Sequence, residues 1–134
     1  MLQKEVAQRM AARPGGKEYG PLSIFVQLVL DLSVRFFIKP SAFFPPPKVA
    51  SAVVQMAWKE KPMIQANEEE WFRRVVKACF GYRRKTLINA MRHSELSLPE
   101  SAESRMEQAG IDPRRRPETL TIPEFAKLAN VLRA

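Results

Sequence analysis

The chain has 134 residues, 46% of them hydrophobic, which is enough for one domain or for a domain with a small appendage. Lys and Arg outnumber Asp and Glu by 22 to 14, and the resulting net charge of +8 favours a polyanionic partner, nucleic acid before membrane. One Cys and one His exclude an intrachain disulfide framework and argue against a metal site of the structural zinc type.

The same composition points to a soluble protein without a membrane partner. The most apolar segment, Leu22 to Ile38, is interrupted by Gln27, Asp31 and Arg35, so it cannot supply the ~20 apolar residues of a membrane span. A secretory signal is also missing from the first residues, because Lys4, Glu5 and Arg9 break any apolar run there. A single cysteine suits a reducing compartment, and we expect a cytoplasmic location.

Residues 1–62 predict helices and a pair of antiparallel strands. Met1 to Gln3 can finish a strand, and the next apolar residues recur at helical spacing up to the break at Arg13-Pro14-Gly15-Gly16. The apolar run from Leu22 to Leu30 predicts a buried helix. Alternation of apolar and other residues over Leu32–Lys39 and again over Ser51–Lys59 predicts two strands, with Leu32, Val34, Phe36 and Ile38 on one face of the first.

The segment that joins these two strands holds Phe43 and Phe44 on a run of three prolines, Pro45 to Pro47. Proline fixes φ and lacks an N–H donor, so the segment is a stiff, extended loop outside the sheet. Such a loop can present an aromatic ring to a flat ligand. From the residues alone, burial of both rings in a core is the favoured interpretation, because aromatic side chains bury large areas.

Residues 66–134 predict a small all-α helical domain of four helices after a polar linker. Asn67 is expected to cap a helix that ends at Gly81, and a short helix is expected over Arg84–Arg92. Two capping boxes with an early proline, Ser97-Leu98-Pro99-Glu100 and Thr121-Ile122-Pro123-Glu124, predict helices that end near Gly110 and near Arg133.

Basic residues gather at two places in this second part. Three consecutive cations, Arg83-Arg84-Lys85, repel one another at a helix junction, and a phosphate backbone is their natural neutraliser. Arg114-Arg115-Arg116 is expected to be exposed in a loop between two prolines, whereas Arg73, Arg74 and Lys77 are expected to be an ordinary solvated helix face.

Three other side chains are of types that can carry chemistry, but a structural interpretation is favoured for each. Tyr82, beside the basic cluster, is open to stacking on a base, but partial burial against the first helix is favoured. Cys79 is expected to be a buried, inert thiol, and His93 a surface residue without a catalytic role.

The motif Phe43-x-Pro-x-Pro-Lys-Val-x-Ser-Ala-Val-Val54 resembles the adenine-contacting motif of the rRNA adenine dimethyltransferase family, of the KsgA type. The segments Met1 to Arg9, Tyr19 to Ser23, Arg83 to Leu87 and Gly110 to Pro113 occur in the family's order and spacing. The resemblance implies that Phe43 stacks on the target adenine. It also implies RNA contact by Arg83, Arg84, Lys85 and Arg116, with Arg9 as a further RNA contact beside the site.

The resemblance covers only the later part of the family's sequence. The glycine-rich site for S-adenosylmethionine and the motif that binds the target amine lie upstream of the residues matched here, and no glycine turn in this chain replaces them. The chain is therefore expected to be a C-terminal fragment of α+β class. Residues 1–62 would be the end of a Rossmann-like catalytic domain, with helices and an antiparallel strand pair, and residues 66–134 a helical rRNA-binding domain.

The implied enzyme transfers methyl groups from S-adenosylmethionine to two adjacent adenosines near the 3′ end of small-subunit rRNA during ribosome assembly. The fragment itself is expected to bind rRNA of the assembling small subunit, to hold neither cofactor nor metal, to lack catalysis, and to self-associate through exposed strand edges. Two alternatives stay open: an Erm-type enzyme that acts on large-subunit rRNA, and a non-catalytic basic helical module that binds nucleic acid.

Overall fold

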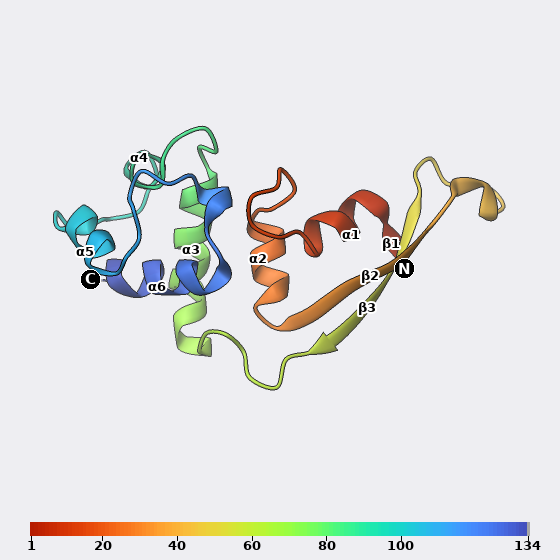
Figure 1. Cartoon of the computed structure of the whole chain (residues 1–134), viewed down its shortest axis with the longest axis horizontal. Helices are drawn as coiled ribbons and strands as arrows, with labels where there is room; N and C mark the ends of the chain where they lie inside the picture. Colours follow the sequence, from red (N-terminus) through yellow and green to blue (C-terminus); the bar gives the residue numbers. More distant parts are fainter. Residues whose placement is uncertain (134) are drawn as a thin grey trace. The chain divides into compact units, whose positions relative to one another are not determined.

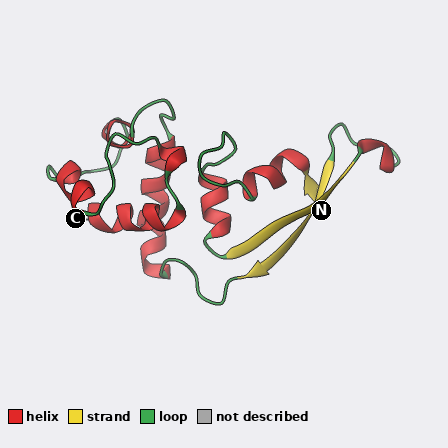
Figure 2. Ribbon diagram, viewed as in Figure 1, coloured by secondary structure: helices red, strands yellow, loops and turns green. Residues whose placement is uncertain are grey.

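The computed structural model describes residues 1–133 and contains helices and antiparallel strands, as the fold class predicts (Figure 2). The chain divides into two compact units, residues 1–62 and 63–134, and each is described by itself (Figure 1). Over the described length, every helix is too short or too polar to cross a lipid bilayer.

The first unit is built on a three-stranded antiparallel sheet. The strand order is β1 (Leu2–Gln3), β3 (Ser51–Trp58), β2 (Leu30–Ile38), so β3 lies in the centre. The predicted pairing of the two long strands and the terminal strand at residues 2–3 are therefore confirmed. Strands β2 and β3 are joined by the proline-rich loop, drawn in gold, which extends away from the helices of the unit (Figure 1).

A β-bulge interrupts the alternation of faces that was predicted for β2, so this prediction was wrong after Val34. Val34 pairs with Val54, but Phe36 pairs with Val53, so Arg35 is an extra residue in its strand. One added residue exchanges the faces of all later residues in the strand. Phe36, predicted on the face of Leu32 and Val34, is consequently on the other face and is 56% exposed.

Two helices, α1 (Lys4–Met10) and α2 (Pro21–Gln27), pack on the sheet and bury the core of the first unit. This core consists of Ala7, Tyr19, Ile24, Leu28 and Ala52. The side chain of Gln27 donates to the carbonyls of Met10 and Ala12, at 2.8 and 2.9 Å, and so ties α2 to the end of α1. The buried helix predicted over Leu22–Leu30 was too long: α2 ends at Gln27, Leu30 already belongs to β2, and Leu22 is 42% exposed.

In the described part of the second unit, residues 63–133, the regular elements are all helical. They are α3 (Glu69–Phe80), α4 (Leu87–Arg92), α5 (Ala102–Gln108) and α6 (Ile122–Leu132), with 3-10 turns η2 (Ala66–Glu68) and η3 (Pro117–Thr119). Their core contains the fully buried Phe72, Val75, Cys79, Leu87, Met91, Met106, Phe125, Leu128 and Leu132. The predicted ends of α3 and α5 are confirmed, because Gly81 comes directly after Phe80 and Gly110 adopts a positive φ of 81° two residues after Gln108.

One of the two predicted capping boxes forms. Thr121 accepts from the N–H of Glu124 at 3.2 Å, and Glu124 accepts from the N–H of Thr121 at 3.0 Å. The box predicted at Ser97–Glu100 is wrong, because α5 begins at Ala102 after a turn in which the N–H of Ala102 donates to the carbonyl of Pro99.

Two other predicted helix starts also differ from the structure. Asn67 does not cap α3, because the helical turn begins one residue earlier, in η2, after the extended backbone of Gln65. The short helix predicted from Arg84 starts only at Leu87. Its first two N–H groups donate to the carbonyls of Arg115 and Pro113, at 2.8 and 3.2 Å, so a distant loop fixes where α4 begins.

Candidate nucleic-acid interface

The proline-rich loop of the first unit holds its two aromatic rings differently. Phe43 comes after the 3-10 turn η1 (Pro40–Ala42), donates its N–H to the carbonyl of Pro40 at 3.2 Å, and is half-buried. Phe44 is 99% exposed, so its interpretation as a core-packing residue was wrong. Neither ring is buried in the core, and the loop can offer an aromatic surface to a flat ligand.

The second unit brings two basic loops together. The loop of residues 81–86, between α3 and α4, lies against the loop of residues 113–116, because the start of α4 donates to carbonyls of that second loop. The guanidinium of Arg116 donates to the carbonyl of Arg84 and closes the contact from the other side. We call Arg83, Arg84, Lys85 and Arg116 the basic patch; its three arginines are exposed and Lys85 is half-buried.

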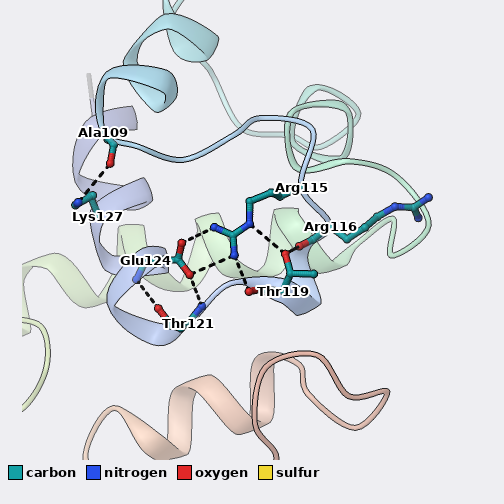
Figure 3. A network of polar contacts seen from close by, with 7 residues as sticks. All are labelled: Ala109, Arg115, Arg116, Thr119, Thr121, Glu124 and Lys127. Carbon is teal, nitrogen blue, oxygen red and sulfur yellow. Dashed lines mark hydrogen bonds and ion pairs between the residues drawn. The ribbon is translucent and has the colours of Figure 1, made fainter.

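Arg115, the neighbour of Arg116, has a structural task instead (Figure 3). Its guanidinium pairs with the carboxylate of Glu124 and donates to the carbonyl of Thr119 at 2.7 Å. Both side chains of the pair are about two-thirds buried, with 29% and 32% exposed for Arg115 and Glu124. The hydrogen bond from Arg115 lowers the pKa of Glu124 below its ordinary value. The expectation that all three consecutive arginines are exposed is therefore wrong for Arg115.

The side chains predicted as a solvated helix face do lie on the surface. Arg73 pairs with Glu69 at 2.8 Å on the exposed side of α3, and the guanidinium of Arg74 lies 5.5 Å from the centre of the Trp71 ring. Lys77 is exposed on the same helix. A phosphate that binds Arg73 or Arg74 must therefore compete with these contacts within α3.

Arg9 belongs to the first unit, on α1, and is apart in the chain from the basic patch. Its guanidinium pairs with Glu5 one turn earlier at 2.9 Å, and both side chains are largely exposed. Its carbonyl accepts the hydroxyl of the buried Ser23, which anchors α1 to α2. A phosphate that binds Arg9 must therefore compete with the carboxylate of Glu5.

Tyr82, at the start of the basic loop, was expected to be partly buried against the first helix of its unit. It is partly buried, with 45% of its surface exposed, and its ring contacts that of His93 with 5.6 Å between the ring centres. Sequence reasoning missed this pair because the two residues are separated by α4, and only the turn of the chain around that helix brings them together.

Residues 1–133 hold neither an accessible cysteine thiol nor a cluster of metal-binding side chains. The thiol of Cys79 is fully buried, and burial raises its pKa to about 12, which excludes it as a nucleophile. No group of three His, Cys, Asp or Glu side chains in this range can hold a metal ion. Gly15 and Gly16 lie between two helices, and the strand pairs are antiparallel, so these residues do not fit the strand–glycine turn–helix that holds S-adenosylmethionine.

Comparison with known sequences gives one consistent result. A family model described as "Ribosomal RNA adenine dimethylase" matches residues 1–134. The "Ribosomal RNA small subunit methyltransferase A" of Geobacter metallireducens is 45% identical over 135 residues, which cover 100% of this chain and 49% of that protein. The protein of the same name from Clostridium acetobutylicum is 48% identical over 130 residues, which cover 97% of this chain and 47% of that protein. The chain spans about half the length of the curated relatives it matches.

Comparison with solved structures agrees. A dimethyladenosine transferase from Plasmodium falciparum has a TM-score of 0.75 at 26% identity, with 94% of this chain and 53% of that chain covered. The 23S rRNA methyltransferase ErmE has a TM-score of 0.61 at 19% identity, with 97% and 52% covered, which is a likeness of fold alone. The fold class predicted from the sequence, a part of a Rossmann-like methyltransferase, is supported by these neighbours.

Proposed function

This chain belongs to the ribosomal RNA adenine dimethylase family, and from that premise we propose that it is the rRNA-binding, C-terminal part of an S-adenosylmethionine-dependent enzyme. The proposed enzyme dimethylates adenosines of small-subunit rRNA in the cytoplasm. The names of the relatives at 45% and 48% identity support the small subunit rather than the large one as the substrate. The proposal assigns phosphate contact to the second unit and adenine contact to the first.

The observation that carries the proposal is the joining of two distant basic segments into one surface. Arg116 reaches 32 residues back along the chain to the carbonyl of Arg84, and this contact joins its loop to the one that also carries Arg83 and Lys85. Repulsion between these like charges raises the free energy of the folded chain, and a bound polyanion lowers it again. Each cation that neutralises a phosphate makes binding depend more steeply on salt.

The role proposed for Phe43 is based on its loop. The exocyclic amine of adenine is a weak nucleophile, because its lone pair is delocalised into the ring, so the base must be taken out of its stack and held in position. Phe43 sits beside a 3-10 turn on a proline-stiffened strap, partly open to solvent, and would stack on the extruded base. Arg9 is proposed as an additional RNA contact of the same unit.

A test of adenine contact by Phe43 requires the upstream half of the enzyme. We would fuse this chain to the upstream half of the Geobacter metallireducens relative and measure methyl transfer to small-subunit rRNA. Phe43→Ala should lower kcat/KM about 5- to 100-fold, the range of a lost base stack. Phe44→Ala is the matched control, because its ring is the neighbouring one on the same loop.

Two results would contradict the proposal. Equal losses in both Phe variants would remove the specific stacking role from Phe43. Turnover by the isolated chain with S-adenosylmethionine would contradict the division of labour, because the described residues offer no site for the cofactor.

A further inference from the structure

Tyr82 and His93 form an aromatic pair on the surface of the second unit. Their ring centres are 5.6 Å apart and their planes meet at 59°. His93 comes after the last residue of α4, and its Nδ1 lies 2.8 Å from the carbonyl of Asn89, where Nδ1–H donates and holds the imidazole in place. Tyr82 keeps 45% of its surface in solvent, so burial alone does not explain its position.

Basic residues follow Tyr82 in the chain, and one of them, Lys85, lies over its ring. The ammonium of Lys85 lies 5.9 Å from the centre of the Tyr82 ring, and the backbone N–H of Lys85 donates to the carbonyl of Tyr82 at 2.9 Å, so the two residues share one turn. Arg83 and Arg84 come between them in the chain, and Arg116 is bonded to the carbonyl of Arg84. A partly exposed aromatic ring beside a lysine, on a loop that also carries two arginines, has the character of a site for a nucleobase and its phosphates.

We infer that Tyr82 and His93 are a stacking site for an unpaired base of the RNA, separate from the loop of Phe43. The inference rests on the proposed RNA binding by the basic patch. Stacking requires a base outside the double helix, since the bases of a paired A-form stem are stacked on one another and their faces are closed. The ligand is therefore an RNA helix with a bulged or loop nucleotide, its phosphates against Arg83, Arg84 and Arg116 and its base against Tyr82.

The test compares two RNA hairpins with the same stem, one fully paired and one with a single bulged purine. Wild-type chain should bind the bulged hairpin about 5- to 100-fold more tightly at one fixed salt concentration. Tyr82→Ala should bring the two affinities together, Tyr82→Phe should keep the preference, and His93→Ala should reduce it. Trp58→Ala is the control, because Trp58 is an exposed aromatic residue of the first unit, with 78% of its surface in solvent.

The salt dependence separates stacking from charge. Tyr82→Ala removes no phosphate contact and should leave the slope of log affinity against log salt unchanged, whereas Arg84→Gln should make the slope shallower by about 0.7 to 0.9. Should Tyr82→Ala fail to fold, Tyr82→Leu replaces it, because leucine keeps apolar bulk but has no aromatic face.

Equal binding of both hairpins by the wild-type chain, or a preference that survives in Tyr82→Ala and Tyr82→Leu, overturns the stacking site. If salt-dependent RNA binding persists in that case, the proposed function stands without it. Absence of salt-dependent binding to either hairpin overturns both the stacking site and the proposed RNA binding. A protein partner whose binding is lost in Tyr82→Ala would then account for the exposed ring.

Discussion

Replacement of Arg115 tests whether this arginine holds the second unit together rather than contacting RNA. In Arg115→Met the apolar stem remains, but the ion pair with Glu124 and the hydrogen bond to the carbonyl of Thr119 are lost. Exposed pairs contribute about 0.5 kcal/mol and removal of one partner from a fully buried pair costs about 3–5 kcal/mol. With about two-thirds of both side chains buried, we expect a loss of about 1.5 kcal/mol in the free energy of unfolding.

The assay is thermal unfolding followed by circular dichroism, in which about 1.5 kcal/mol corresponds to a fall in Tm of roughly 6–12 °C for a domain of this size. Arg114→Met is the matched control: Arg114 is the preceding residue, its side chain is 86% exposed, and its replacement should stay within about 0.5 kcal/mol of the wild type. Equal effects of the two substitutions would refute the structural role of Arg115.

The same pair predicts a dependence on pH. Its hydrogen bond lowers the folded-state pKa of Glu124, so this contribution to stability is present above the pKa of the unfolded carboxyl and is lost as the pH falls through the folded-state value. The stability difference between wild type and Arg115→Met should therefore shrink in acid. A difference that stays constant from neutral pH to pH values below the ordinary glutamate pKa would contradict this assignment.

Two further substitutions and one labelling experiment check the described geometry. Gly110→Ala should cost about 1–2 kcal/mol in chemical denaturation, because Gly110 has a φ of 81°, whereas Gly81→Ala, at a φ of −64°, should be close to neutral; equal costs would be inconsistent with the left-handed turn after α5. Thr121→Ala should lower the unfolding free energy by about 1 kcal/mol through loss of the α6 cap, and no change would remove the capping box. The thiol of Cys79 should resist a thiol reagent at pH 8 until denaturant is added, because its pKa is raised to about 12 and it is fully buried; rapid labelling of the native chain would show that it is accessible.

Local sequence signals predicted the elements that depend only on neighbours in the chain. The hairpin of β2 and β3 is predicted by period-two alternation, and the capping box at Thr121 by a spacing of three residues. The box at Ser97 has the same local signal and fails. The two helices differ in the apolar residues that they bury: Ile122, Phe125, Leu128 and Leu132 line one buried face of α6, while α5 buries the smaller set of Ala102 and Met106.

Features set by distant contacts could not be predicted. The bulge at Arg35 depends on how β2 pairs with β3, and a period-two pattern contains no record of an extra residue. The start of α4 depends on carbonyls of residues 113 and 115, and the task of Arg115 depends on Glu124. Three consecutive arginines look alike in sequence, and only folding separates the exposed Arg114 and Arg116 from Arg115, which is largely buried against Glu124.

The basic patch is the central element of the proposed RNA binding, and one binding series tests its role directly. Affinity for an rRNA hairpin would be measured over a range of salt concentrations for the wild type and two triple variants that remove the same charge. Replacement of Arg83, Arg84 and Lys85 by Gln should weaken binding strongly and reduce the salt slope by about 2 to 3. Replacement of Arg73, Arg74 and Lys77 by Gln on the surface of α3 should leave most of the affinity and slope in place. Equal effects of the two triple variants would contradict the claim that this chain binds RNA through the basic patch.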